Sequence, residues 1–375
     1  MWKIWICAAA KQWHVYHNAI DHIRGESVQC QGPHRVVITA EMKKFILQQD
    51  ECSIPPMRIH SNLRHTSDII ESTRGFPTLL QVTNCAKYLR MLQGTKNSIN
   101  AVKEIVQKNA FDPTGNLTRA FCFGHRESAS GHAVVGKGTD ADSFVVGVSS
   151  RALVEASIEY ASGSRFTLFH ADATFKLSDL GYPVITCGFS DASRSYQLAA
   201  IFIVSRRTAK EYAMCLEAFV RLVKQVRPTA TLSIDAVMGD AEDAQLNGFQ
   251  QVSEFGNATY LMCFFHVLYN VRKRTKHLAP EHRKAVMNGI IRIHYTDNMT
   301  SYYTEKDEVV ASWRKIPELE VFVKYFTEQW LDSRYWRWQV FHTPIGYATT
   351  NNPCETFNAV LKKYTGRRRY HMQRL

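Results

Sequence analysis

The stretch VMGDAEDAQLNGF, residues Val237–Phe249, decides how the rest of the chain is arranged. An apolar run ends at Gly239-Asp240, and a helical pattern begins directly after this pair. The change of pattern predicts a buried strand followed by a helix. Asp240 therefore lies at the tip of a strand, where its carboxylate adds nothing to an apolar core. A carboxylate in this position indicates a polar site if other acidic residues converge on the same strand end.

The elements around this stretch follow a regular order. Three strands joined by short turns precede it, because three runs are rich in aromatic and β-branched residues: 165–176, 182–190 and 196–205. A helix then begins at Thr208, which forms a capping-box pattern with Glu211. After the strand that ends at Asp240, the pattern predicts a helix, a short strand at 259–264 and another helix from 266. We therefore expect a mixed α/β protein.

Three strands, a helix and a strand are the sequence order of the ribonuclease H-like fold. We expect that fold here, with three antiparallel strands followed by parallel strands. The expected parts of the chain are an N-terminal region at 1–65, a helical and loop connector at 66–160, a ribonuclease H-like domain at 161–277 and 346–375, and an all-helical insertion at 278–345. The tryptophans of the insertion, Trp330, Trp336 and Trp338, are expected in its core rather than as platforms for nucleic-acid bases.

The composition favours an anionic partner and excludes several other classes of protein. The 375 residues carry a formal net charge of +12, which suits nucleic acid or an acidic membrane surface. Nine scattered cysteines without a C-x-x-C pair argue against a disulfide scaffold and favour a reducing compartment. No apolar run approaches the ~20 residues of a membrane span. No nucleotide-binding or acyl-transfer motif supports a small-molecule enzyme.

The N-terminal region is expected to be small and mainly helical. Residues 38–64 indicate a helix, a turn and a second helix, with Thr39 as the cap of the first helix and with Met42, Phe45 and Ile46 on one face of it. Pro55-Pro56 ends this pattern, and a short helix follows, so a helical hairpin is favoured over a helix-turn-helix motif. The preceding residues Cys7, His14, His17 and His22 give a weak zinc-finger pattern, in which only the histidine end has suitable spacing. Zn²⁺ at the N-terminus is thus a weak hypothesis.

Two further carboxylates are placed to join Asp240. Asp172 lies in the first strand, which in the expected fold is the neighbour of the fourth, and Glu355 opens a late helix with Asn352 as its cap. Adjacent carboxylates repel each other, and divalent metal ions relieve that repulsion. Simpler roles compete: Asp240 as a helix cap, and Glu355 in a capping box with Asn352. Asp235 is a rival for the role of Asp240, whereas Glu242 and Asp243 are expected to face solvent.

Four segments, taken in order, resemble the transposases of Mutator-like elements (MULEs): FHADATFKL, VMGDAEDAQLNGF, CFFHVLYNVRKR and NNPCETFNAVLKK. The resemblance covers about residues 140–366. It implies a DDE-type active site of Asp172, Asp240 and Glu355 that holds two Mg²⁺ or Mn²⁺ ions. It also assigns Cys263 and His266 to the C-x-x-H motif of the family. The family usually has a longer N-terminal zinc-binding module and often a zinc knuckle after the Glu helix, so an incomplete copy is expected.

The resemblance implies a DNA transposase that hydrolyses phosphodiester bonds at transposon ends and transfers the freed strand to target DNA. Double-stranded DNA would be its partner. The chain would act as a homo-oligomer on DNA in the nucleus, without contact with a membrane. The alternative is a domesticated or decayed DNA-binding protein without catalytic activity. Nine basic residues are candidates for DNA phosphate contacts, although such runs are also import signals or solvated faces: Arg272, Lys273, Arg274, Lys276, Lys362, Lys363, Arg367, Arg368 and Arg369.

Cys263 and His266 also have a second interpretation. Together with His277 and His282 they give the spacing C-x2-H-x10-H-x4-H, which is close to that of a zinc finger. The residues between the two pairs are expected to form one continuous helix, which would separate them. A structural or substrate-positioning role beside the active site is therefore favoured for Cys263 and His266.

Overall fold

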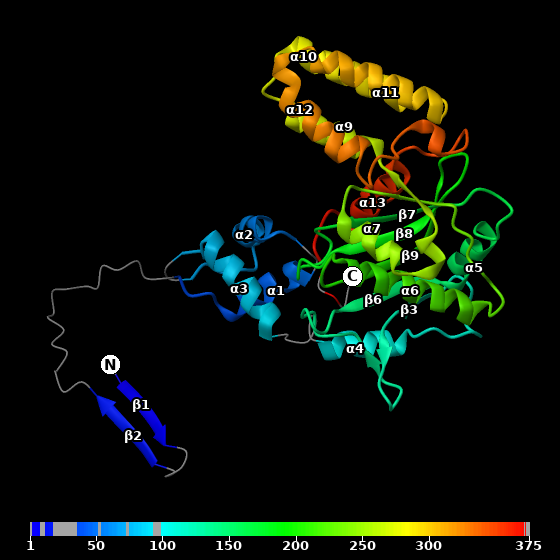
Figure 1. The fold of residues 1–375 in the computed structure, drawn as a ribbon. Coiled ribbons are helices and arrows are strands. Elements are labelled where there is room, and N and C mark those ends of the chain that lie inside the picture. Colours follow the sequence, from blue (N-terminus) through cyan, green and yellow to red (C-terminus); the bar gives the residue numbers. More distant parts are fainter. Residues whose placement is uncertain are drawn as a thin grey trace. The chain divides into compact units, whose positions relative to one another are not determined.

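The computed structural model describes residues 2–7, 12–17, 36–51, 54–72, 75–92, 99–370 and 372. The chain divides into two compact units, residues 1–92 and 93–375, which are described separately (Figure 1). None of the helices that the structure describes is long and apolar enough to span a membrane.

The N-terminal unit contains a β-hairpin and three helices. Strands β1 (Trp2–Cys7) and β2 (Gln12–His17) pair in antiparallel fashion, a hairpin that the sequence analysis did not identify. The helices are α1 (Ala40–Glu51), α2 (Pro56–His65) and α3 (Leu79–Leu92). The expected cap is confirmed, because the backbone N–H of Met42 donates to Thr39 Oγ1 at 3.2 Å. The expected helical hairpin is extended by α3, which supplies Val82 and Ala86 to the shared apolar core.

The second unit is built on a seven-stranded mixed sheet with the order β11-β10-β7-β8-β9-β6-β3. Strands β7 (Leu168–Thr174), β8 (Val184–Ser190) and β9 (Tyr196–Val204) form the expected antiparallel meander. Strand β10 (Ala236–Gly239) lies parallel to β7, and β11 (Thr259–Met262) lies parallel to β10. The first and fourth strands of the expected fold are thus neighbours. This arrangement is consistent with a ribonuclease H-like fold.

Two strands that the sequence analysis assigned to a connector extend this sheet. Strands β6 (Val145–Ser150) and β3 (Ala120–Phe123) continue it beyond β9, both in antiparallel pairing. The apolar run of β6 is short, follows a Gly-rich loop and leads directly into α5, so its partner strand could not be inferred from local pattern alone. The same region adds α4 (Ile99–Lys108), α5 (Arg151–Tyr160) and a small ribbon of β4 (Arg126–Glu127) and β5 (Ala133–Val134). The segment 66–160 is therefore not one connector.

Alternating residues of β7 point to opposite faces of the sheet, as in any strand. Phe169 and Ala171 belong to the large core that also contains residues of α5 and of α6 (Ala209–Val226). His170 and Asp172 bond instead to residues of α13 (Asn352–Tyr364) and the residue before it. The capping box of α6 is confirmed, because the Glu211 carboxylate accepts from the Thr208 backbone N–H at 3.1 Å. Helix α13 thus covers the polar face of β7.

The helices that follow β10 and β11 are short. They are α7 (Asp243–Gln250), α8 (Ser253–Gly256) and α9 (Phe264–Arg274). The next region is helical, as expected: α10 (Pro280–His294), α11 (Met299–Arg314), η1 (Pro317–Leu319), α12 (Glu320–Phe326), η2 (Thr327–Leu331) and η3 (Val340–His342). Trp330 and Trp338 are buried in its core, as expected, and Trp336 is half-buried. The Trp338 indole donates to the Trp330 carbonyl at 2.8 Å, which satisfies its buried N–H.

Candidate metal-binding active site

The site is built where β7 and β10 run side by side. Both strands point in the same direction, so their carboxyl ends meet at one edge of the sheet. Asp172 lies near the end of β7, and Asp240 directly follows β10. The parallel pairing of β7 with β10 therefore brings together two carboxylates that are 68 residues apart in the sequence, which is the difference between the two residue numbers.

Asp172 is held in place by the last helix. The Asn358 side-chain amide of α13 donates to Asp172 Oδ2 at 2.6 Å, and the Thr186 hydroxyl of β8 donates to Asn358 Oδ1 at 2.9 Å. Burial raises the pKa of Asp172, and the nearby charge of Asp240 raises it further, whereas the Asn358 hydrogen bond opposes both effects. Asn358 therefore orients the carboxylate and stabilises its charged form.

Asp240 faces the first turn of α9. Its Oδ1 lies 2.9 Å from Nδ1 of His266. The distance suits a hydrogen bond, but the angles at the two atoms do not. The contact is therefore an ion pair without a well-directed hydrogen bond. Burial lowers the pKa of His266, but the adjacent Asp240 and Cys263 outweigh burial and raise the pKa to about 11. Positive charge on His266 is therefore the counterion of Asp240 when no metal ion is bound.

Gln245 of α7 fixes the strand end that carries Asp240, and the sequence analysis did not single it out. Its Nε2 donates to the carbonyl of Ala171 at 2.6 Å, and its Oε1 accepts from the backbone N–H of Asp240 at 3.0 Å. The Tyr260 hydroxyl donates to the Asp240 carbonyl at 2.6 Å. One buried amide thus joins the backbones of both aspartates. A Gln five residues after the strand-end Asp was the only sequence signal for this role.

Glu355 is supplied by α13, which begins one residue earlier than expected. The Asn351 carbonyl accepts from the Glu355 N–H at 3.0 Å, so Asn351 and not Asn352 is the cap, and Pro353 is the second helical residue. The side chain of Asn351 makes no capping bond to the helix, and the capping box of Asn352 with Glu355 is not formed. Glu355 Oε1 is buried without a hydrogen-bond partner, which leaves its charge available to a cation.

The three carboxylates interact electrostatically, but their oxygens do not converge into one tight cluster. Burial raises the pKa of Glu355, His266 opposes this, and Asp172 and Asp240 add to it. In the part of the chain that the structure describes, only one group of three His, Cys, Asp or Glu side chains brings its ligand atoms within 4.8 Å of one another: Asp240, Cys263 and His266. The oxygens of Asp172, Asp240 and Glu355 therefore do not all lie within that distance of one another.

Other acidic residues near the site behave differently from expectation. Glu242 was expected to face solvent but is half-buried and pairs with Arg207 at 3.1 Å. Burial raises the pKa of Glu242, Arg207 opposes this, and Asp240 and Asp172 add to it. The reason is that Glu242 is the residue before α7 and does not lie on the exposed side of that helix. Asp243 is largely exposed, as expected. The rival Asp235 precedes β10, at its other end, where it accepts from the Thr167 N–H at 2.8 Å.

Two Cys and His patterns in the sequence resemble zinc fingers, one at Cys263 and one at the N-terminus, and the structure bears on them differently. Cys263 and His266 lie together, but His277 and His282 do not join them, because α9 continues to Arg274 and separates the two pairs. For the N-terminal pattern, His22 lies outside the described residues. Cys7, His14 and His17 are described only as strand backbone. That hypothesis stays a prediction.

The basic candidates lie on two helix ends. Arg272, Lys273 and Arg274 form the last turn of α9, all exposed, and Arg274 lies over the Tyr325 ring at 4.6 Å. Exposed Lys276 follows. Lys362 and Lys363 end α13, followed by exposed Arg367, Arg368 and Arg369. Both helices begin at the carboxylate site, and the basic residues lie at their far ends.

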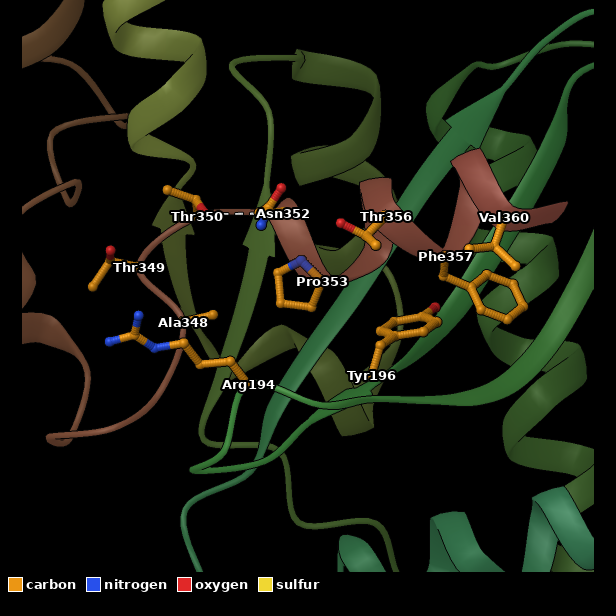
Figure 2. A pocket seen from close by; sticks show the side chains of 10 residues that line it. All are labelled: Arg194, Tyr196, Ala348, Thr349, Thr350, Asn352, Pro353, Thr356, Phe357 and Val360. Carbon is orange, nitrogen blue, oxygen red and sulfur yellow. Dashed lines mark hydrogen bonds between the residues drawn. The ribbon is translucent and has the colours of Figure 1, made fainter. Parts of the chain in front are cut away.

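A pocket of about 480 Å³ lies against a different face of α13 (Figure 2). Pro353, Thr356 and Phe357 line it from the helix, and Tyr196 lies beneath Phe357 with ring centroids 5.2 Å apart. Arg194, its one charged lining residue, donates to the Gly346 carbonyl at 3.1 Å. The pocket includes none of the three carboxylates, because Glu355 points from another side of the same helix. It is therefore separate from the carboxylate site.

The donor set fits hard divalent cations. Mg²⁺ and Mn²⁺ prefer carboxylate oxygens, and the site offers three carboxylates. Asp240 Oδ1 and Glu355 Oε1 are buried atoms without hydrogen-bond partners, and a cation would satisfy both. Burial raises the pKa values of Asp172 and Glu355, and repulsion from the neighbouring carboxylates adds to this effect. A bound cation would relieve that repulsion. The residues present are thus suitable ligands for such ions.

His170 connects β7 to the start of α13, and it makes the stability of the fold sensitive to pH. Its Nδ1–H donates to Asn351 Oδ1 at 2.9 Å, and its Nε2 accepts from the Ser190 hydroxyl at 2.7 Å. Burial lowers its pKa to about 4, against the opposing effect of the Asn351 bond. The unfolded chain binds this proton near pH 6.5 and the folded chain only near pH 4. Folding therefore loses stability as the pH falls through this window.

We expect the ionisation of His170 to lower the free energy of unfolding by about 3 kcal/mol between pH 7 and pH 4. The measurement is urea unfolding of the chain and of His170→Gln across this range. The variant should show a shallower fall in unfolding free energy, whereas the exposed His277→Gln should match the parent. Equal slopes for the parent and His170→Gln would contradict the assignment.

Residues 168–270 match the family model of the MULE transposase domain. The match extends from the start of β7 into α9 and includes Asp172, Asp240, Cys263 and His266. Glu355 lies outside the matched residues. No curated protein matches the chain.

Proposed function

We propose, on the basis of the MULE transposase domain match over residues 168–270, that this chain is a DNA transposase that cleaves phosphodiester bonds with divalent metal ions. The observation that carries the proposal is the adjacency of Asp172 and Asp240 on parallel strands, with Glu355 in electrostatic contact with both. Asp172, Asp240 and Glu355 would hold Mg²⁺ or Mn²⁺. When bound, two such ions activate a water or a 3′ hydroxyl and stabilise the departing oxygen.

The residues of the chain have separate tasks in this reaction. Asn358 orients Asp172, and Gln245 holds the backbones of both aspartates at a fixed spacing. His266 balances the charge of Asp240. The basic ends of α9 and α13 would bind double-stranded DNA through its phosphates, which positions the strand without reading its sequence. After hydrolysis at a transposon end, the freed 3′ hydroxyl would attack target DNA.

The assembly around this chemistry is part of the same proposal. Two transposon ends must be brought together for strand transfer, so the chain would act as a homo-oligomer on DNA, in the nucleus. The second candidate is a DNA-binding protein that has lost the chemistry. It is favoured by one observation: the oxygens of the three carboxylates do not all lie within 4.8 Å of one another.

A plasmid assay separates the two candidates. The transposase should nick supercoiled DNA with Mg²⁺ or Mn²⁺, and the nicking should stop when the ions are chelated. A decayed protein should bind DNA in a salt-sensitive manner and leave it intact with either ion. The second result would reject the catalytic proposal.

Metal binding gives a test that does not depend on activity. Glu355→Gln should weaken Mn²⁺ binding, measured by the loss of the free-ion signal in electron paramagnetic resonance, by at least about tenfold. The loss of a residue that orients a metal ligand lowers metal affinity by about 10–100-fold, and the loss of a ligand itself should cost at least as much. Glu328→Gln, on the exposed side of the helical insertion, is the matched control and should bind Mn²⁺ as the parent does. Unchanged binding by Glu355→Gln would remove this residue from the site.

A further inference from the structure

A mixed group of ligand atoms lies beside the carboxylate site. One atom each from Asp240, Cys263 and His266 lies within 4.8 Å of the other two. Asp240 follows β10, Cys263 follows the adjacent parallel strand β11, and His266 lies in the first turn of α9. The group therefore rests on neighbouring strand ends and the start of a helix, which are rigid elements of the fold.

Two of these atoms are buried without hydrogen-bond partners. Asp240 Oδ1 and His266 Nδ1 face each other at 2.9 Å, and neither satisfies the geometry of a hydrogen bond. Buried polar atoms in this condition are uncommon and need an explanation. Ligands of a tetrahedral zinc ion with bond lengths of about 2.0 Å lie about 3.3 Å apart. The two atoms would thus need to separate by only a few tenths of an ångström to share an ion.

The side chain of Cys263 is held in place by contacts with the backbone. The Asn351 backbone N–H donates to Cys263 Sγ at 3.2 Å. Cys263 is also the N-cap residue of α9. Its backbone is fixed by a bond from its N–H to the Gly239 carbonyl at 3.0 Å. The sulfur therefore has a fixed position beside the other two ligand atoms.

We propose that Asp240, Cys263 and His266 form a Zn²⁺ site with one open position, and that Zn²⁺ bound there withdraws Asp240 from the Mg²⁺ site. Thiolate and imidazole are ligands that Zn²⁺ prefers and Mg²⁺ avoids, so the group selects Zn²⁺ although it shares a carboxylate with Asp172 and Glu355. Three protein ligands and a water are a common zinc coordination. Binding requires the loss of the Cys263 thiol proton and of any proton on His266 Nδ1. The inhibition by Zn²⁺, but not the binding itself, rests on the proposed function.

Cobalt titration of the metal-free full chain without DNA tests the binding. Co²⁺ takes the place of Zn²⁺, and a thiolate ligand produces a charge-transfer absorption in the near ultraviolet. Both Cys263→Ser and His266→Gln should lose one bound equivalent of Co²⁺ together with its absorption. Zn²⁺ should displace the same equivalent from the parent chain. The controls Cys122→Ser, a buried cysteine of β3, and Glu355→Gln should retain it.

The outcomes separate this proposal from the proposed function. A full charge-transfer band in folded Cys263→Ser overturns the zinc site, whether or not the chain nicks DNA. If Cys263→Ser does not fold, unchanged Co²⁺ affinity in His266→Gln overturns it instead. For the inhibition, added Zn²⁺ should suppress Mg²⁺-dependent nicking, and a zinc-selective chelator should restore it. Nicking that is insensitive to Zn²⁺ at a concentration that saturates the site overturns the inhibition alone.

Discussion

Asp240→Asn is expected to lower the rate of Mg²⁺-dependent nicking by on the order of 10³-fold. The loss of one preorganised electrostatic group at a reacting centre lowers the rate about 10²–10³-fold, and Asp240 is also a proposed metal ligand. The substitution keeps the size of the side chain and removes its charge. It leaves the bonds of the Asp240 backbone to Gln245 and Tyr260 unchanged. The fold and the bulk affinity for DNA should therefore stay close to those of the parent.

The measurement is the initial rate of nicking of supercoiled plasmid, with DNA binding and thermal unfolding recorded on the same samples. Asp243→Asn is the matched control, because this neighbour is 72% exposed and its carboxylate contacts Arg334 and Tyr335 of the helical insertion. It should nick at the rate of the parent. Nicking by Asp240→Asn at the parental rate would refute the role of Asp240.

Gln245→Ala should destabilise the second unit by about 3 kcal/mol. The side chain is 2% exposed, and its loss leaves the Ala171 carbonyl and the Asp240 N–H without their buried partners. Each unsatisfied buried group costs about 1–3 kcal/mol. The nicking rate of the folded fraction should also fall, on the order of 10²-fold, because a misplacement of about 1 Å at a reacting centre has an effect of that size.

Chemical denaturation and the nicking assay below the unfolding transition check these two effects separately. Gln251→Ala is the matched control, because this residue is exposed at the end of α7. Its stability and activity should equal those of the parent. A stable Gln245→Ala chain would show that the two strand ends are held by other contacts.

The sequence predicted the parts of the fold that local patterns encode. The aromatic and β-branched runs that became β7, β8 and β9 were recognisable, as was α6 with Thr208 and Glu211. Strand β3 was missed, because four residues give little periodic signal. Its antiparallel partner β6 also lies far from it in the sequence, so no local pattern indicates the pairing. The N-terminal hairpin was missed because its residues were interpreted as metal ligands.

The site was predictable only in part, for a similar reason. Asp172 and Asp240 were identified from their place in strand patterns, and Glu355 from its helix and from the resemblance to MULE transposases. Gln245 and His170 were not, because a buried polar residue has no local pattern of its own. Its role depends on partners such as the Ala171 carbonyl or Asn351, which only the folded chain brings near.

The sequence by itself determined the order of strands and helices and the acidic residues at their ends, because hydrophobic periodicity and capping are local properties. Only the tertiary structure decided which side chains share a charge centre. The parallel pairing of β7 with β10 and the packing of α13 across β7 bring Asp172, Asp240 and Glu355 together, and the start of α9 adds Cys263 and His266 to Asp240. Electrostatic coupling depends on distance in space, which the spacing of residues along the chain does not set.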